Sequence, residues 1–137
     1  MENPTTKYTI LWADDDQDDL MVMREVMHEI DATCDIVEVE NGRKVMEFLS
    51  AAKQKDQFPC LIVLDMNMPI MSGRETLAAI KADPQLSSIP VVVFTTSNSE
   101  LDRVFCKRYG VEMLTKPLTF SGTKQIVSEL FNYCRLS

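Results

Sequence analysis

A run of four branched apolar residues, Leu61 to Leu64, places the strongest constraint on how this chain can fold. The run follows Pro59, ends abruptly on Asp65 and is not continued by a helical or alternating pattern before Pro69. Such a run between turn residues is typical of a strand that is buried on both faces. Asp65 could simply cap a loop. However, open α/β sheets bind ligands at the carboxyl ends of their strands, so its position also suits chemistry.

Strand-like and helix-like segments alternate along the chain. We predict five strands, over Tyr8–Ala13, Asp35–Glu40, Leu61–Leu64, residues 91–94 and Val111–Thr115. We predict five helices, over Asp18–Ile30, a segment after Asn41-Gly42 with Val45 and Leu49, a segment with Thr76 and Ile80, Ser99–Tyr109, and Phe120–Cys134. The helices are indicated by apolar residues that recur every three or four positions. This alternation implies a parallel sheet with helices on both faces, joined by right-handed crossovers.

Length and composition are those of one folded domain. The chain has 137 residues, of which 45% are hydrophobic, enough for a sizeable core. We expect residues 1–6 to be a polar tail and residues 7–137 to be the domain. Neither a signal-peptide pattern nor a membrane-spanning run is visible, so we predict a cytoplasmic protein with no membrane partner. The net charge of −7 argues against binding to nucleic acid, which requires a basic surface.

The four cysteines, at positions 34, 60, 106 and 134, are widely spaced and form no CxxC pair. Their spacing therefore indicates neither a zinc site nor a redox motif. Each cysteine stands among apolar residues, and we expect all four to be buried and reduced.

Polar residues stand directly after four of the predicted strands. Asp14 and Asp15 follow the first strand, Asp65 the third, Thr95 the fourth and Lys116 the fifth. In a parallel sheet these ends lie at one edge. If the strand order is 2-1-3-4-5, the three aspartates share a pocket at the switch point between the first and third strands. A merely acidic helix start would explain the aspartates after the first strand but not the residues at the other strand ends.

The residues at this edge suit the binding of a metal ion and a phosphoryl group. Three neighbouring carboxylates repel one another, and a hard cation such as Mg²⁺ relieves that repulsion. Thr95 offers a hydroxyl donor and Lys116 a positive charge, which together with a metal would neutralise phosphoryl oxygens. An aspartate can itself accept a phosphoryl group as a nucleophile.

Other phosphate-handling or hydrolytic sites are not indicated. The four glycines build neither a GxGxxG fingerprint nor a GxxxxGK loop, so we expect no nucleotide cofactor. The single histidine, His28, falls inside the first predicted helix and is expected on its surface, which argues against a Ser-His-Asp hydrolase.

From Ile10 to about Cys134 the chain resembles the receiver domain of two-component response regulators. The matching features are Asp14-Asp15 after the first strand, LDMNMPIMSG around Asp65, VVVFTTS around Thr95, and Lys116-Pro117. The resemblance implies a flavodoxin-like, doubly wound five-stranded α/β fold with strand order 2-1-3-4-5. It also implies a phosphorylation-controlled switch, expected here as a stand-alone receiver that acts by binding a partner.

The resemblance implies a phosphorylation site centred on Asp65. Asp65 would accept the phosphoryl group from a phosphohistidine on a sensor kinase or a phosphotransfer protein. Thr95 and Lys116 would hold the phosphoryl oxygens, and the Lys116–Pro117 peptide bond would be cis. Such a protein catalyses only its own phosphorylation and dephosphorylation, and is not otherwise an enzyme.

The implied Mg²⁺ site has four residues. Asp15 and Asp65 would bind the ion directly, Asp14 through a water molecule, and Asn67 through its backbone carbonyl. Two other positions depart from the usual family pattern. Met113 stands where the family usually has Tyr or Phe, and Thr96 stands where it usually has a small residue.

Two alternatives stay open at this point. A Mg²⁺-dependent phosphatase of the haloacid dehalogenase type also has a nucleophilic aspartate after an apolar strand, but it needs a second aspartate where this chain has Asn67. A receiver that binds partners without phosphorylation is the other alternative, although the complete set of acidic, Thr and Lys residues argues against it. We further expect the last two helices, with Phe131 and Tyr133, to contribute to a homodimer or partner interface.

Overall fold

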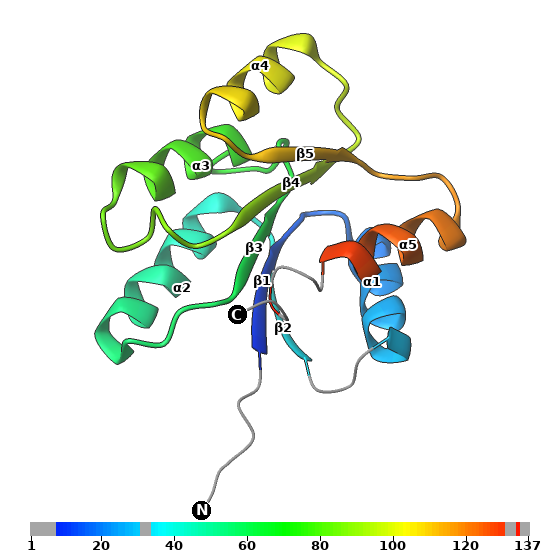
Figure 1. Cartoon of the computed structure of the whole chain (residues 1–137), viewed down its shortest axis with the longest axis horizontal. Coiled ribbons are helices and arrows are strands. Elements are labelled where there is room, and N and C mark those ends of the chain that lie inside the picture. The colour runs from blue at the N-terminus through cyan, green and yellow to red at the C-terminus, as the bar shows by residue number, and fades with distance from the viewer. Residues whose placement is uncertain (1–7, 31–33, 131–133, 135–137) are drawn as a thin grey trace, which may run out of the picture.

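The centre of the molecule is a sheet of five parallel strands in the order β2-β1-β3-β4-β5. The structure is a computed structural model, and it describes residues 8–30, 34–130 and 134. Helices cover both faces of the sheet (Figure 1). The predicted flavodoxin-like α/β fold and its strand order are therefore confirmed. The predicted tail over residues 1–6, and Phe131 and Tyr133, lie outside the described residues.

The observed elements follow the predicted ones closely. The strands are β1 (Tyr8–Ala13), β2 (Cys34–Val39), β3 (Leu61–Leu64), β4 (Val91–Thr95) and β5 (Glu112–Thr115). The helices are α1 (Gln17–Ile30), α2 (Gly42–Lys55), α3 (Gly73–Ala82), α4 (Glu100–Arg108) and α5 (Phe120–Leu130). None of the helices within the described ranges has the length and apolarity needed to cross a membrane.

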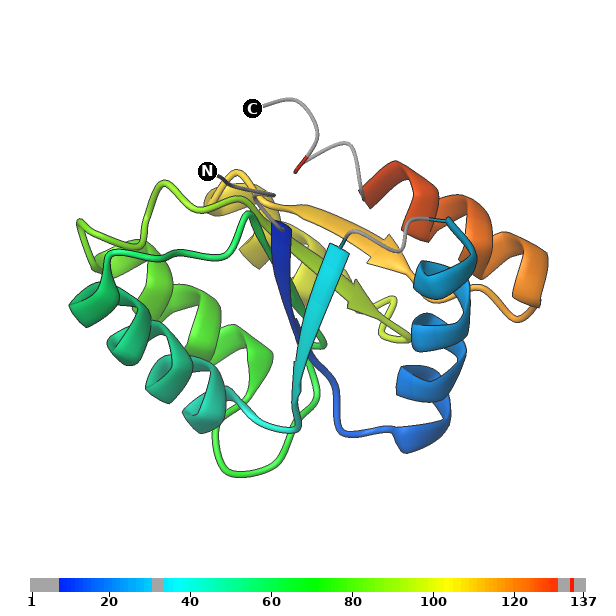
Figure 2. The same ribbon diagram turned by 90° about the horizontal axis from the view of Figure 1, so that it is seen from below.

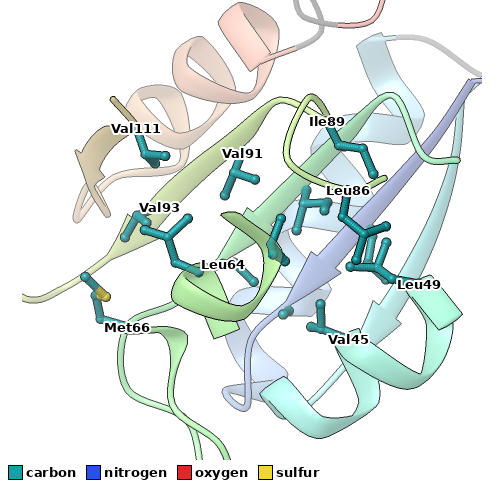
Figure 3. Close-up of a cluster of buried hydrophobic side chains, with 14 of the residues drawn as sticks. Val45, Leu49, Leu64, Met66, Leu86, Ile89, Val91, Val93 and Val111 are labelled. Carbon is teal, nitrogen blue, oxygen red and sulfur yellow. The ribbon is translucent and has the colours of Figure 1, made fainter. Parts of the chain in front are cut away.

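The sheet separates two apolar clusters. Helices α1 and α5 lie together on one face, and α2 and α3 lie on the other (Figure 2). Because side chains alternate along a strand, Leu11 and Ala13 of β1 face one cluster, whereas Ile10 and Trp12 face the other. Figure 3 shows the cluster that contains Leu11 and Ala13, in which side chains of β3 and β4 pack against those of α2.

Strands β3 and β4 are buried along their whole length, as the apolar runs predict. Strand β2 lies at one edge of the sheet, and its described side chains are less completely buried. In the centre, the last residues of β1 and β3, Ala13 and Leu64, lie opposite each other. The residues that follow them, Asp14 and Asp65, therefore emerge side by side at the carboxyl edge of the sheet.

The loop after β3 is held tightly against the strand. Ser72 and Glu75 form a reciprocal capping box at the start of α3. A Cβ atom on Gly73 would lie 2.1 Å from the backbone oxygen of Asp65, so this close approach requires glycine. Ile70, in the same loop, has φ +69°, which is a strained conformation for a β-branched residue.

The prediction that all cysteines are reduced is wrong. Cys60, directly before β3, forms a disulfide with Cys134, and their Cα atoms lie 5.2 Å apart. The two residues are 74 positions apart in sequence, so their proximity depends on the packing of the chain end against the sheet. Cys106 of α4 is a buried free thiol, as expected. The side chain of Cys34 lies outside the described residues.

The implied cis Lys116–Pro117 bond is also wrong, because no peptide bond within the described ranges is cis. For a bond before proline, trans is favoured by only about 0.5–1 kcal/mol. Local sequence motifs therefore do not settle which isomer the surrounding structure selects.

Candidate functional site

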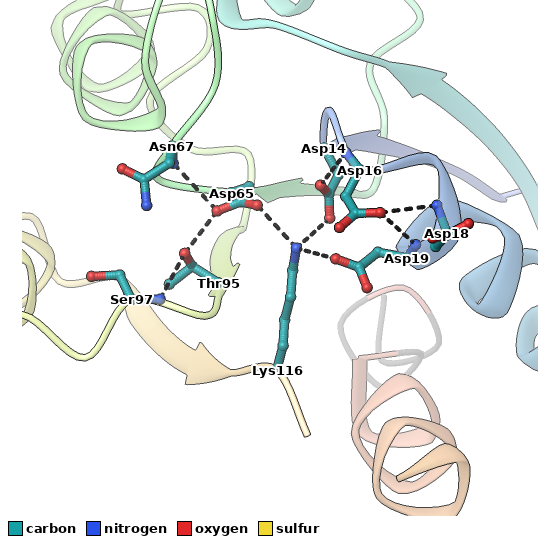
Figure 4. Close-up of polar contacts among 9 residues, drawn as sticks. All are labelled: Asp14, Asp16, Asp18, Asp19, Asp65, Asn67, Thr95, Ser97 and Lys116. Atoms are coloured by element: carbon teal, nitrogen blue, oxygen red, sulfur yellow. Dashed lines mark hydrogen bonds and ion pairs between the residues drawn. The ribbon is translucent and has the colours of Figure 1, made fainter. Parts of the chain in front are cut away.

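The predicted polar side chains converge at the carboxyl edge of the sheet (Figure 4). Asp14 follows β1, Asp65 follows β3, Thr95 ends β4 and Lys116 follows β5. Asp14, Asp65 and Thr95 are buried, with 1%, 7% and 0% of their surface exposed. Charged and polar groups this deeply buried need partners, and each of the three finds one within the same pocket.

Lys116 lies at the centre of the pocket. Its ammonium donates hydrogen bonds to Asp14 Oδ2 at 2.6 Å, to Asp19 Oδ2 at 2.7 Å and to Asp65 Oδ2 at 2.9 Å. Burial alone would lower the pKa of Lys116, but the hydrogen bonds to the three carboxylates outweigh it and raise the pKa above its ordinary value. The residue is therefore a fixed positive charge beside Asp65.

Thr95 contacts the other oxygen of Asp65. Its hydroxyl donates to Asp65 Oδ1 at 2.7 Å, in a fully buried hydrogen bond. The same hydroxyl oxygen accepts a hydrogen bond from the backbone N–H of Ser97 at 3.2 Å. The two oxygens of Asp65 are thus held separately, one by a hydroxyl and the other by an ammonium.

The pocket also perturbs the ionisation of Asp14. Burial raises its pKa to about 6, although the hydrogen bonds from Lys116 and from the backbone of Asp16 act in the opposite direction. The nearby charge of Asp65 also raises the pKa. The pocket therefore holds more negative charge than the single lysine compensates.

Asp14, Asp15 and Asp65 are arranged as a divalent cation site would require. One carboxylate oxygen from each lies within 4.8 Å of the others, and Asp15 is exposed while the other two are buried. Hard oxygen ligands of this kind suit Mg²⁺ and similar cations. Asn67 lies beside them, with its backbone N–H directed to Asp65 Oδ1 at 3.3 Å. The acidic triad is thus able to bind a divalent metal.

Sequence reasoning missed part of the site. Asp16 does act as a helix cap, because its carboxylate accepts from the backbone N–H groups of Asp18 and Asp19. Asp19, however, also reaches Lys116 across the pocket. Asp19 lies in the first turn of α1, and its contact with Lys116 becomes apparent only once that helix is placed against the sheet.

A second polar cluster, also missed, connects the site to α4. The Ser97 hydroxyl donates to Asp102 Oδ2 at 2.8 Å, and Asp102 forms an ion pair with Arg74 of α3. Asp102 is buried. Although burial alone would raise its pKa, the hydrogen bonds from Ser97 and Arg74 outweigh that effect and lower it. An aspartate in the first turn of a helix resembles an ordinary capping residue in sequence, which conceals this role.

Met113, Thr96 and His28 are the three other positions that the sequence singles out. Met113 of β5 is partly buried and packs against the apolar cluster formed with side chains of α2, α3 and α4. Thr96 is exposed, and so is His28 on α1, as predicted.

The sequence and the fold resemble those of known proteins. Residues 10–128 match the model of the response regulator receiver domain family. Response regulator Rcp1 of Synechocystis is 38% identical over 95 residues, which cover 68% of this chain and 65% of Rcp1, just under two thirds of that protein. The probable methanogenesis regulatory protein FilR2 of Methanothrix harundinacea is 30% identical over 128 residues, which cover 92% of this chain and 83% of FilR2.

Solved structures of response regulators also resemble this chain along nearly its whole length. The phosphorylated cyanobacterial phytochrome response regulator RcpA superposes with a TM-score of 0.85 at 32% identity, covering 93% of this chain and 94% of RcpA. The Mn²⁺-bound form of Rcp1 superposes with a TM-score of 0.81 at 32% identity, with the same coverage. Together with the acidic pocket, these matches show that the chain belongs to the family of response regulator receiver domains of two-component signalling.

Proposed function

We propose that Asp65 accepts a phosphoryl group and that its phosphorylation switches the binding of a partner by the domain formed by residues 7–137. The observation that carries this proposal is the environment of Asp65, a buried carboxylate with a hydroxyl on one oxygen and an ammonium on the other. Both groups are hydrogen-bond donors. The charge that arrives with a phosphoryl group therefore meets a hydroxyl and a positive charge already in position.

In the proposed transfer, a carboxylate oxygen of Asp65 forms a bond to phosphorus while the bond from phosphorus to the donor nitrogen breaks. The histidine of the donor leaves with the electron pair of that bond. Lys116 supplies positive charge to the transferred oxygens, and Thr95 supplies a hydroxyl donor. Both already contact Asp65, so little side-chain reorganisation is needed.

A divalent cation, which we propose is Mg²⁺, would be held by Asp14, Asp15, Asp65 and the backbone carbonyl of Asn67. Bound there, it would offset the charge of the carboxylates and of the phosphoryl oxygens. The donor set is entirely oxygen, as Mg²⁺ prefers. The relative Rcp1 has a Mn²⁺-bound structure, and Mn²⁺ prefers ligands of the same kind.

Membership of the receiver family implies a histidine kinase as partner. We propose that the donor is a phosphohistidine of such a kinase or of a phosphotransfer protein, and that transfer takes place in the cytoplasm, where ATP is available to the kinase. A cavity of about 200 Å³ opens beside Lys116 and is lined by Leu118 and Phe120, among others. Both side chains are exposed, and they offer the donor an apolar contact next to the pocket.

Family membership also excludes the haloacid dehalogenase alternative. Whether the protein is phosphorylated, or instead binds partners without phosphorylation, is tested by experiment. The full chain is incubated with acetyl phosphate and Mg²⁺, and the mass of the intact protein is then measured by mass spectrometry. We expect one added phosphoryl group, none in an Asp65→Asn variant, and normal labelling of Asp16→Asn, a matched aspartate that caps α1. Equal labelling of Asp65→Asn would contradict the assignment.

The downstream partner is proposed to bind at α4, either as another protein or as a second copy of this chain. Leu101 and Val104 are 79% and 50% exposed on this helix, and they line a hollow together with Arg74 and Arg108. Sedimentation with and without beryllofluoride tests the homodimer. A monomer both with and without beryllofluoride would eliminate the homodimer. If Val104→Glu loses partner binding but is still phosphorylated, the α4 surface is the binding site.

A further inference from the structure

The disulfide joins two parts of the fold that lie 74 positions apart in sequence. Cys60 lies immediately before β3, at the opposite end of the strand from Asp65. Cys134 lies four residues beyond the last residue of α5, Leu130, and is fully buried against the same apolar cluster as Leu130 and Val127. The bond therefore fastens the end of the chain to the central strand.

The two cysteines differ in their exposure to solvent. Cys134 is 0% exposed, whereas Cys60 is only partly buried. Cys60 also lines a cavity of about 750 Å³ between α2 and the start of β3, with Phe48, Lys55 and Phe58 among its other lining residues. A small thiol can therefore approach the sulfur of Cys60 but not that of Cys134. Disulfides with an exposed sulfur are the labile and regulatory ones.

The surroundings also accommodate the reduced state. The sulfur of Cys60 lies 3.4 Å from the backbone oxygen of Thr9, which can accept a hydrogen bond from a thiol. Cys134 lies among apolar side chains, where a reduced cysteine behaves as a small hydrophobic residue. Each sulfur therefore has surroundings that suit a thiol when the bond is broken.

We propose that Cys60 and Cys134 form a reversible thiol-modification site, through which small-molecule thiols and disulfides release or fasten the C-terminal end of α5. This function is separate from phosphorylation of Asp65. Asp65 lies five residue steps of extended chain from Cys60, or roughly 16 Å. The redox state of the pair is therefore expected to act on the chain end and to leave phosphoryl transfer intact.

The chemistry is thiol–disulfide exchange. A thiolate of a small molecule such as glutathione attacks the sulfur of Cys60, forming a mixed disulfide, and the sulfur of Cys134 leaves and takes up a proton. A second small thiolate attacks the mixed disulfide and releases the thiol of Cys60. The protein disulfide and two thiols thus become two protein thiols and one small-molecule disulfide, and the reverse reaction closes the bond.

Release of the bond should loosen α5, because the helix packs against α1 and the chain four residues beyond it is fastened at Cys134. Closing a long loop covalently restricts the opened and unfolded states. In the oxidised protein, local opening of α5 therefore recovers less conformational freedom. Amide hydrogen exchange over residues 120–130 should be roughly tenfold or more faster in the reduced protein than in the oxidised one.

The test uses the full chain equilibrated in mixtures of reduced and oxidised glutathione. Free thiols are alkylated and counted by mass, and the disulfide is located by peptide mapping. We expect two of the four thiols to become protected together, as a Cys60–Cys134 pair, and to be released again by millimolar glutathione. Protection of a different pair, no protection at any ratio, or a bond that millimolar glutathione does not open would overturn the proposal.

Variants separate the modification from general effects on folding. In Cys134→Ser, Cys60 should accumulate as a mixed disulfide with glutathione, whereas in Cys60→Ser, Cys134 should stay unmodified. Cys106→Ser is the matched control, because Cys106 is a buried free thiol, and it should keep the wild-type redox response. Under reducing conditions all three variants are compared with reduced wild type, so that any effect of serine itself is measured. Equal hydrogen exchange of α5 in oxidised and reduced wild type would refute the link to the helix.

Discussion

Replacement of Lys116 by methionine tests whether its ammonium holds the acidic pocket together when no metal is bound. Methionine retains most of the apolar stem and removes only the charge. Asp14 and Asp65, whose side chains are 2% and 9% exposed, then lose the cation that contacts both of them. Asp19 is 42% exposed and can turn toward water. The effect on stability should therefore come mainly from the two buried carboxylates.

The expected size follows from this burial. Removing one partner of a buried ion pair costs about 3–5 kcal/mol, because the remaining charge stays desolvated. We expect a loss of this size in the free energy of unfolding at pH 8. At pH 5 Asp14, with its pKa of about 6, is already mostly protonated in wild type and needs no counter-ion. The loss at pH 5 should therefore be about half as large, or smaller.

The assay is urea unfolding in the presence of a chelator, followed by the fluorescence of Trp12, the single tryptophan, which is buried in the sheet. Millimolar Mg²⁺ should restore part of the lost stability, because it brings positive charge and binds only the folded state. Lys124→Met is the control, since Lys124 pairs with Glu29 at the surface and should lose less than about 1 kcal/mol. A loss for Lys116→Met as small as that of the control, or one that does not depend on pH, would refute the reasoning.

Three further predictions concern the same edge of the sheet. Because the pKa of Asp14 is raised in the folded protein, the folded state binds this proton more tightly than the unfolded chain does. Without metal, the wild-type protein should therefore lose about 3 kcal/mol of stability as the pH rises from about 4 to above 6. Asp14→Asn should lose much less in the same urea titration. Gly73→Ala should lower stability by about 1–3 kcal/mol or more, because its Cβ would overlap the backbone of Asp65; an unchanged thermal midpoint would contradict the close approach. Ile70→Gly should raise stability by about 1 kcal/mol, because glycine adopts φ +69° without strain; a lower urea midpoint would show that strain at this residue is not the dominant effect.

Much of the fold and the main features of the site were predictable from the sequence, for a definite reason. A strand buried on both faces is apolar along most of its length, so β3 and β4 stand out as apolar runs after Pro59 and Pro90. Both runs end where polar residues begin. Parallel topology then brings those ends to one edge, whatever the loops between them do. This reasoning is enough to group Asp14, Asp65, Thr95 and Lys116 from the sequence.

The tertiary structure alone decided which contacts these groups make. Lys116 meets Asp19 across 97 residues of sequence, Cys60 meets Cys134 across 74, and Asp102 is buried rather than exposed at a helix start. No local pattern encodes these contacts, because each depends on how a helix is positioned against the sheet. Helix position is set by the summed packing of many apolar side chains, and that sum exists only in the folded molecule.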